Sequence, residues 1–197
     1  WSSDVCSSDL DFCRWLARQA EAMGVDIFPG FAAASILYDD AGAVAGITTG
    51  DMGINARGEE KPGFTPGMNL LAKYTLFAEG CRGHLGKQLI ANYQLDAGRD
   101  PQHYALGIKE LWEIPAEKSR PGEVIHASGW PLSDGASGGS FLYHAGNNQV
   151  VVGLIVDLNY RNPYLSPFDE FQRMKHHPAF RATLSGGKRL SYGARAI

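Results

Sequence analysis

The sequence predicts a mixed fold of the α/β (α+β) class, with helices and short strands first and a mainly antiparallel sheet afterwards. Two observations support this prediction. Before Pro101, apolar residues recur at helical spacing in residues 11–23 and again after Gly83, with strand-like runs between the two. After Pro101, apolar residues alternate along residues 104–114, which is typical of a strand with one buried face.

The elements before Pro101 are predicted from apolar spacing and turn residues. Gly24 stands where a helix C-cap belongs, and Asp39-Asp40-Ala41-Gly42 indicates a hairpin turn. Residues 52–66 are rich in Gly, Pro and charge, which favours an exposed loop. The predicted order is a helix at residues 11–23, strands at 25–28, 31–38 and 43–49, a loop at 52–66, a strand at 68–76 and a helix after Gly83.

The elements after Pro101 are predicted in the same way, as strands at residues 104–114, 124–127, 141–144 and 149–158. A helix is expected to begin after Ser166, because Ser166 is a favoured N-cap and Pro167 suits the first turn, and to end at His177-Pro178. Glu110 lies on the apolar face of residues 104–114. We interpret it as a paired structural carboxylate, with a functional acid as the alternative.

Composition excludes several classes of protein. The net charge of −3 provides no basic surface for nucleic acid, and no run reaches the roughly 18–20 apolar residues that cross a bilayer. Cys6, Cys13 and Cys81 form no C-x-x-C pair, so buried or idle thiols in a reducing compartment are expected. Three cysteines are too few for an iron–sulfur cluster. The six histidines are scattered or adjacent, and no metal site is predicted.

Residues 75–86 contain an acid and three glycines between an apolar run and a helix. Glycine lets a ligand approach the backbone, and the N–H groups of a helix start attract phosphate. Residues Glu79, Gly80, Cys81 and Arg82 are therefore candidate contacts of a dinucleotide, and an ordinary glycine-bearing turn is the alternative. The fingerprint G-x-G-x-x-G does not occur in the chain, so the main phosphate site of a flavin would lie upstream of Asp11.

The glycines around Ser137 allow two functional interpretations. Gly135-Ala136-Ser137-Gly138-Gly139 matches the hydrolase motif G-x-S-x-G, but a nucleophile elbow needs a strand before the serine and a helix after it. Here a turn precedes Ser137 and a strand follows, which argues against a hydrolase. Alternatively, Gly138 and Gly139 expose backbone donors beside Phe141-Leu142-Tyr143, as a quinone site requires. A loose hairpin connection explains the same residues.

Many segments of the chain, in order, resemble the electron transfer flavoprotein–ubiquinone oxidoreductase family. These segments are RWLA (14–17), QAEA (19–22), FPGFAA (28–33), TGDMGI (49–54), FAEGCRGHL (77–85), GIKELWE (107–113), GGSFLYH (138–144), NPYLSPF (162–168), GGKR (186–189) and YGAR (192–195). Residues 77–85 also resemble the second flavin-contacting segment of FAD-dependent reductases and hydroxylases.

The resemblance implies that residues 11–100 are part of an FAD-binding domain and residues 101–197 a ubiquinone-binding domain. It implies a peripheral, monotopic enzyme of the inner mitochondrial or bacterial cytoplasmic membrane. Such an enzyme passes electrons from electron transfer flavoprotein to ubiquinone through FAD and a [4Fe–4S] cluster. Gly138 and Gly139 align with the family's quinone glycines. Ala136-Ser137 replaces the usual Thr-Tyr, which removes an aromatic ring from the expected quinone site.

Two further expectations concern the extent of the chain and the rival functions. Residues 1–10 contain Ser-Ser-Asp twice and are expected to be foreign sequence, and the C-terminal end is expected to lie inside an element, so that the chain is an interior piece. The cluster ligands, the FAD fingerprint and the membrane-contacting segments would then lie outside it, and catalytic residues are not identified. The alternatives are a cluster-free reductase or hydroxylase of the same superfamily and a non-catalytic binding module.

Overall fold

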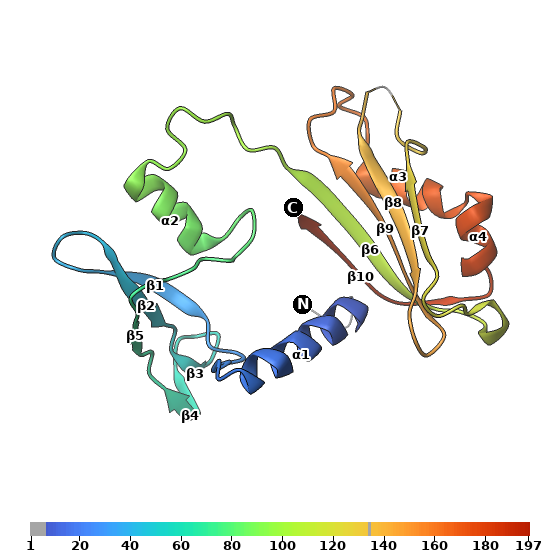
Figure 1. Ribbon diagram of the computed structural model, residues 1–197. Coiled ribbons are helices and arrows are strands. Elements are labelled where there is room, and N and C mark those ends of the chain that lie inside the picture. The colour runs from blue at the N-terminus through green and yellow to red at the C-terminus, as the bar shows by residue number, and fades with distance from the viewer. Residues whose placement is uncertain (1–6, 134) are drawn as a thin grey trace. The chain divides into compact units, whose positions relative to one another are not determined.

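The computed structural model describes residues 7–133 and 135–197. It contains two compact units (Figure 1), each with antiparallel strands and helices, which confirms the predicted fold class. Residues 20–100 form the first unit. Residues 101–133 and 135–197, with residues 7–19, form the second, called the sheet unit below. In the described residues, no helix combines the length and apolar character that a membrane crossing requires.

The first unit has two small antiparallel sheets and a helix. The order of the three-stranded sheet is β1-β2-β5 and the second sheet pairs β3 with β4. The elements are β1 (Ala33–Tyr38), β2 (Val44–Thr49), β3 (Met52–Ile54), β4 (Glu60–Thr65), β5 (Asn69–Leu71) and α2 (His84–Tyr93). Helix α1 (Ser7–Ala22) precedes them, and only its last three residues, 20–22, belong to this unit.

Local sequence signals predict several of these elements correctly. Gly24 ends the first helix with a φ of +88°, although α1 begins at Ser7, within the residues interpreted as foreign. The β1–β2 hairpin closes on the Asp39 carboxylate, which accepts the N–H groups of Ala41 at 3.0 Å and Ala43 at 2.8 Å. Helix α2 has its buried anchor at Leu85, which is 1% exposed.

Three predictions in this unit are wrong because strands depend on partners. Residues 25–28 form no strand. Val25 instead donates its N–H to Ala20 at 3.1 Å and completes the end of α1. The predicted loop at residues 52–66 is the β3–β4 hairpin, closed by the Asn55 side chain, which accepts the N–H groups of Arg57 and Glu59. The predicted strand at residues 68–76 is limited to β5, because its backbone hydrogen bonds to β2 run only from Met68 to Ala72.

The sheet unit contains one five-stranded antiparallel sheet in the order β10-β6-β9-β8-β7. The predicted strands are all present, and β8 begins three residues earlier than expected, at Gly138. The elements are β6 (Ala105–Glu113), the short 3-10 helix η2 (Ala116–Lys118), β7 (Val124–Ser128), β8 (Gly138–His144), β9 (Gln149–Asp157), α3 (Pro167–Lys175), α4 (Pro178–Leu184) and β10 (Lys188–Ala196). Helix α4 and strand β10 were not predicted.

Helix α3 begins as its sequence predicts. The Ser166 hydroxyl accepts the N–H of Asp169 at 3.3 Å and Pro167 occupies the first turn. The helix ends at Lys175, two residues before His177-Pro178. Pro178 then opens α4, because proline suits a first helical turn and cannot continue the preceding helix.

The sheet has two faces of different character. Strand side chains alternate between faces, and the pairing aligns Ile108, Leu154 and Ser140 on one of them. This face packs against the helices and is called the core face. Its core consists of Ile108, Ile114, Leu132, Leu142, Val150, Val152, Leu154, Val156, Phe171, Met174, Phe180 and Leu184.

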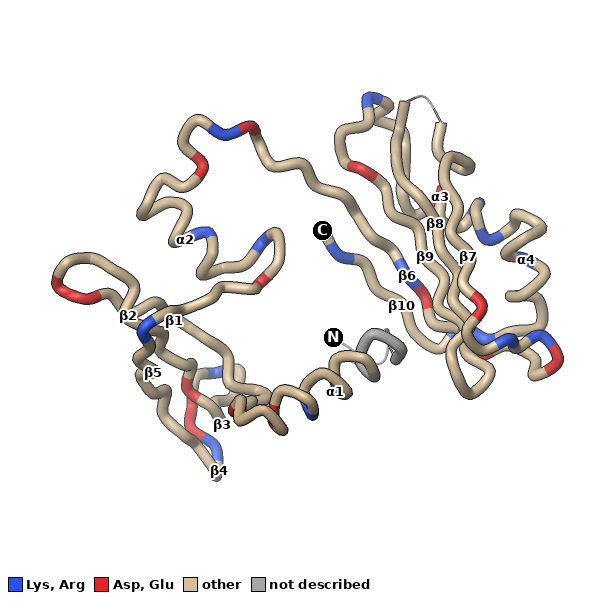
Figure 2. The backbone as a smooth tube through the Cα atoms, in the orientation of Figure 1, with Lys and Arg blue, Asp and Glu red and all other residues tan. Residues whose placement is uncertain are grey.

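The other face, called the second face, carries the residues between these positions. Asp, Glu, Lys and Arg are rare on two of its strands (Figure 2), since β8 has none and β9 has only Asp157. On β6, β8 and β9 the second face consists of Ala105, Gly107, Lys109, Leu111, Glu113, Gly139, Phe141, Tyr143, Gln149, Val151, Gly153, Ile155 and Asp157.

Candidate functional site

Glycines and aromatic rings meet on the second face. Gly139 and Gly107 both pair with Ile155, one from each side, and the next row pairs Gly153 with Phe141. The Phe141 ring lies against Gly153, where an added Cβ would overlap the ring and come within 2.9 Å of the Ile108 carbonyl oxygen. Glycine at position 153 therefore lets an aromatic ring lie flat on the sheet.

The aromatic side chains on this face contact one another. The Phe141 and Tyr143 rings are stacked, with centroids 4.7 Å apart and planes 20° apart. His126 of β7 lies beyond Tyr143 at 6.0 Å. Phe141 and Tyr143 are half-buried. The result is a half-exposed apolar and aromatic surface beside Gly139, which is the kind of lining that planar ligands occupy.

Gly138 and Gly139, the predicted quinone residues, begin β8. The backbone at Gly138 has a φ of +155°, and an added Cβ would overlap the Ile155 carbonyl oxygen. At Gly139 a Cβ would stand 3.0 Å from the Ala127 oxygen, closer than ordinary contacts. Gly138 therefore has no room for a side chain, whereas a side chain at Gly139 needs only a small shift of the Ala127 carbonyl.

The two glycines differ in what their amides can donate to. The N–H of Asp157 bonds to the Ser137 oxygen at 2.9 Å, and the N–H of Ala145 bonds to Gln149 at 2.8 Å. Because bonded pairs alternate along an antiparallel ladder, the Gly139 N–H is directed at Ile155 of β9. The Gly138 N–H points the other way, one position beyond the last β7–β8 pair. Of the two predicted donors, only the Gly138 amide lies outside the β8–β9 ladder.

Ser137 and Asp157 form a polar pair next to these glycines. The Ser137 hydroxyl donates to Oδ2 of Asp157 at 2.6 Å. A turn bonded from Ala136 to Ser133 precedes Ser137 and β8 follows, as the sequence predicts, so the strand-to-helix geometry of a nucleophile elbow is not formed. Asp157 was not singled out from the sequence. The only sign of it was a lone acid at the end of an apolar run.

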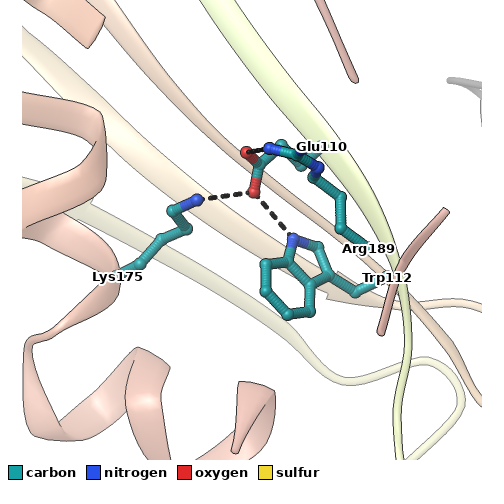
Figure 3. Close-up of polar contacts among 4 residues, drawn as sticks. All are labelled: Glu110, Trp112, Lys175 and Arg189. Carbon is teal, nitrogen blue, oxygen red and sulfur yellow. Dashed lines mark hydrogen bonds and ion pairs between the residues drawn. The ribbon is translucent and has the colours of Figure 1, made fainter. Parts of the chain in front are cut away.

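Glu110 is a buried carboxylate that receives three donors (Figure 3), which confirms the interpretation of a paired structural group. Its side chain on β6 is enclosed by Trp112, Lys175 of α3 and Arg189 of β10. The indole N–H and the Lys175 ammonium donate to Oε2, each at 2.8 Å, and Arg189 donates to Oε1 at 3.3 Å. Strand β6, helix α3 and strand β10 are thus joined through hydrogen bonds to one carboxylate.

In the predicted flavin segment, the Glu79 side chain contacts the start of α2. The Glu79 carboxylate accepts the N–H of Gly86 at 2.7 Å and of Leu85 at 3.4 Å, and its Oε1 lies 3.2 Å from Nδ1 of His84. A Cβ at Gly83 would overlap the Glu79 side chain. Glu79 therefore caps α2, and its carboxylate already accepts two of the N–H groups at the helix start, those of Leu85 and Gly86.

Contacts of Glu79, Gly80, Cys81 and Arg82 with FAD stay a prediction. In the described residues, no three His, Cys, Asp or Glu side chains are grouped as a metal ion would need. Cys13 and Cys81 form no disulfide, and Cys6 lies outside the described residues.

His144 ends β8 on the core face and is 5% exposed. Its Nδ1 accepts the backbone N–H of Arg120 at 3.2 Å, which requires the neutral ring. Burial lowers the pKa of His144 below 6.5, with Glu123 opposing the shift and the Arg120 charge adding to it. The ring is thus a neutral acceptor in the fold.

Comparison with known proteins agrees with the family resemblance. Residues 104–197 match the family described as ETF-QO, ubiquinone-binding. The chain is 63% identical to electron transfer flavoprotein-ubiquinone oxidoreductase of Pseudomonas aeruginosa, over 95% of this chain and 34% of that protein. It is 54% identical to the human mitochondrial protein of that name, over 93% of this chain and 30% of that protein.

The chain thus spans about a third of the length of these relatives. Among solved structures, a triple mutant of the flavin-dependent brominase Bmp2 is similar with a TM-score of 0.55 and 12% identity, over 95% of this chain and 43% of that one. This likeness concerns the fold alone. On the sequence matches, the chain belongs to the electron transfer flavoprotein–ubiquinone oxidoreductase family.

Proposed function

We propose that the chain is the quinone-binding part of an oxidoreductase that transfers electrons from electron transfer flavoprotein to ubiquinone. Residues 101–197 are the ubiquinone-binding domain in this proposal, and residues 11–100 belong to the FAD-binding domain. The observation that carries it is the group of Gly107, Gly139 and Gly153, in two adjacent rows of one sheet face, beside stacked Phe141 and Tyr143.

The chemistry of this face suits a quinone. A substituted quinone ring is flat and largely apolar, so glycines and aromatic rings provide contact without steric obstruction. Its carbonyl oxygens accept hydrogen bonds, and the Gly138 N–H, outside the β8–β9 ladder, is the proposed donor. The names of the relatives favour this function over a cluster-free reductase and over a binding module.

The rest of the reaction lies with parts of the protein beyond these residues. FAD and a [4Fe–4S] cluster would supply the electron carriers, with the cluster ligands and the main FAD phosphate site outside the chain. The intact protein would be peripheral to the bacterial cytoplasmic or mitochondrial inner membrane and would contact it through segments outside the chain.

The test replaces Gly139 by Val in the full-length parent protein. A Val side chain would project onto the second face and block the ring, so reoxidation of the reduced enzyme by a short-chain ubiquinone should fall tenfold or more, about 1.4 kcal/mol. Reduction by electron transfer flavoprotein and flavin content should stay unchanged. Both half-reactions are measured by stopped-flow absorbance.

Gly146→Val is the matched control. Gly146 lies in the β8–β9 turn, and an added Cβ there has no atom within 4 Å. Reoxidation of this variant should equal that of the wild type. If Gly139→Val lowers both half-reactions together, position 139 serves folding alone. If it lowers neither, the quinone binds elsewhere.

A further inference from the structure

The Ser137–Asp157 pair lies on the proposed quinone face. Asp157 is half-buried and is the only charged residue on β8 or β9. It follows Ile155, the partner of Gly139, by two residues, so it stands about 6.5–7 Å further along the same face. A substituted ring placed over Gly139 is wide enough to bring one of its oxygens to this position.

The pair has a defined hydrogen-bonding polarity. The Ser137 proton is already committed to Oδ2 of Asp157 at 2.6 Å, so the hydroxyl offers only lone pairs to a further partner. The carboxylate also accepts and does not donate. A ligand oxygen at this place therefore meets acceptors from both side chains.

Quinone and hydroquinone differ in whether their oxygens can donate a hydrogen bond. Both oxygens of a quinone are acceptors, whereas both oxygens of a hydroquinone carry a proton and donate. A carboxylate beside the ring places two acceptors together in the first case and accepts a charge-assisted hydrogen bond in the second. Discrimination of this kind is strong where an unmatched polar group is partly buried.

We propose that Asp157, oriented by Ser137, is a specificity-determining residue that makes this face bind the hydroquinone more tightly than the quinone. The proposal rests on the proposed function, since it needs the ring to lie over Gly139. Tighter binding of the hydroquinone favours reduction of the bound quinone over reoxidation of the bound hydroquinone. The same contact slows the release of the hydroquinone.

The experiment measures equilibrium binding to the oxidised full-length parent protein, without turnover. A short-chain ubiquinone and, under anaerobic conditions, its ubiquinol are each titrated, and binding is followed by quenching of protein fluorescence. The wild type should bind the ubiquinol at least tenfold more tightly. Asp157→Asn keeps the shape of the side chain and adds a donor, so the preference should disappear or reverse.

Two further variants separate the possible causes. Ser137→Ala keeps the carboxylate but frees its orientation, and the preference should shrink without vanishing. Asp169→Asn removes an acid from the first turn of α3, away from the second face, and should bind both forms as the wild type does. Thermal unfolding of each variant confirms that the fold is intact.

The outcomes distinguish failure of the Asp157 assignment from failure of the proposed quinone site. Equal affinities of the two forms in the wild type, or a preference that survives in Asp157→Asn, would overturn the role of Asp157 and leave the quinone site standing. Binding of both forms that Gly139→Val does not weaken would overturn the proposed location of the site. The assignment of Asp157 would then fall with it.

Discussion

Lys175 of α3 donates to Glu110 of β6 across 2.8 Å, and the accepting side chain is only 2% exposed. The Lys175 ammonium also lies 4.9 Å from the centroid of the Phe171 ring. Desolvation of a carboxylate is costly, and the three donors around Glu110 offset that cost only while all are present. The contact therefore makes docking of α3 on the sheet depend on complete pairing of one buried charge.

Replacing Lys175 by Met should destabilise the protein by about 3–5 kcal/mol, because it leaves Glu110 buried with a donor missing. The free energy of unfolding is measured by urea denaturation. Arg120→Met is the control, since Arg120 forms a surface pair with Glu123 at 3.5 Å and is 74% exposed. Its loss should cost less than about 1 kcal/mol. Equal effects of the two substitutions would contradict the buried-pair account.

Replacing Gly153 by Ala should destabilise the sheet unit by about 1–3 kcal/mol, because the new methyl group overlaps the Phe141 ring and crowds the Ile108 carbonyl. Thermal unfolding monitors the effect. Gly107→Ala is the matched control on the same face, where the nearest atoms to an added Cβ are 3.8 Å away. That change should be tolerated. A large loss of stability in Gly107→Ala would show that both glycines are required for their backbone conformation and not for space beside the ring.

Stability should fall as the pH is lowered because of His144. Its pKa is lowered in the folded state by burial, so below about 6.5 the unfolded chain binds a proton that the folded chain does not. The free energy of unfolding therefore decreases from near pH 6.5 down to the lowered folded pKa. His144→Asn can still accept the Arg120 N–H without titrating, and it should flatten this dependence.

The midpoint of urea unfolding is recorded between about pH 7 and about pH 5 for the wild type and the variant. His103→Asn, at an exposed position before β6, should keep the slope of the wild type. A slope that survives in His144→Asn would assign the acid sensitivity to other groups.

Elements with local signals were predictable from the sequence. The β1–β2 turn depends on Asp39 and its own neighbours, and the start of α3 depends on Ser166 and Asp169, three residues apart. Alternation alone identified residues 104–114 as a strand and placed Glu110 on its apolar face. The donors from Lys175 and Arg189, 65 and 79 residues away, came from elements that no local pattern connects to Glu110.

The sequence by itself determined the periodicity of each strand, the caps and turns, and the family to which its segments are similar. Only the tertiary structure decided which residues share the second face, because strand register depends on pairing between distant segments. Residues 25–28 have strand-like composition but pair with no strand in the described residues, and they stay irregular. Asp157 meets Ser137 because β9 pairs with β8 in one register, and a shift of one residue would place it on the opposite face.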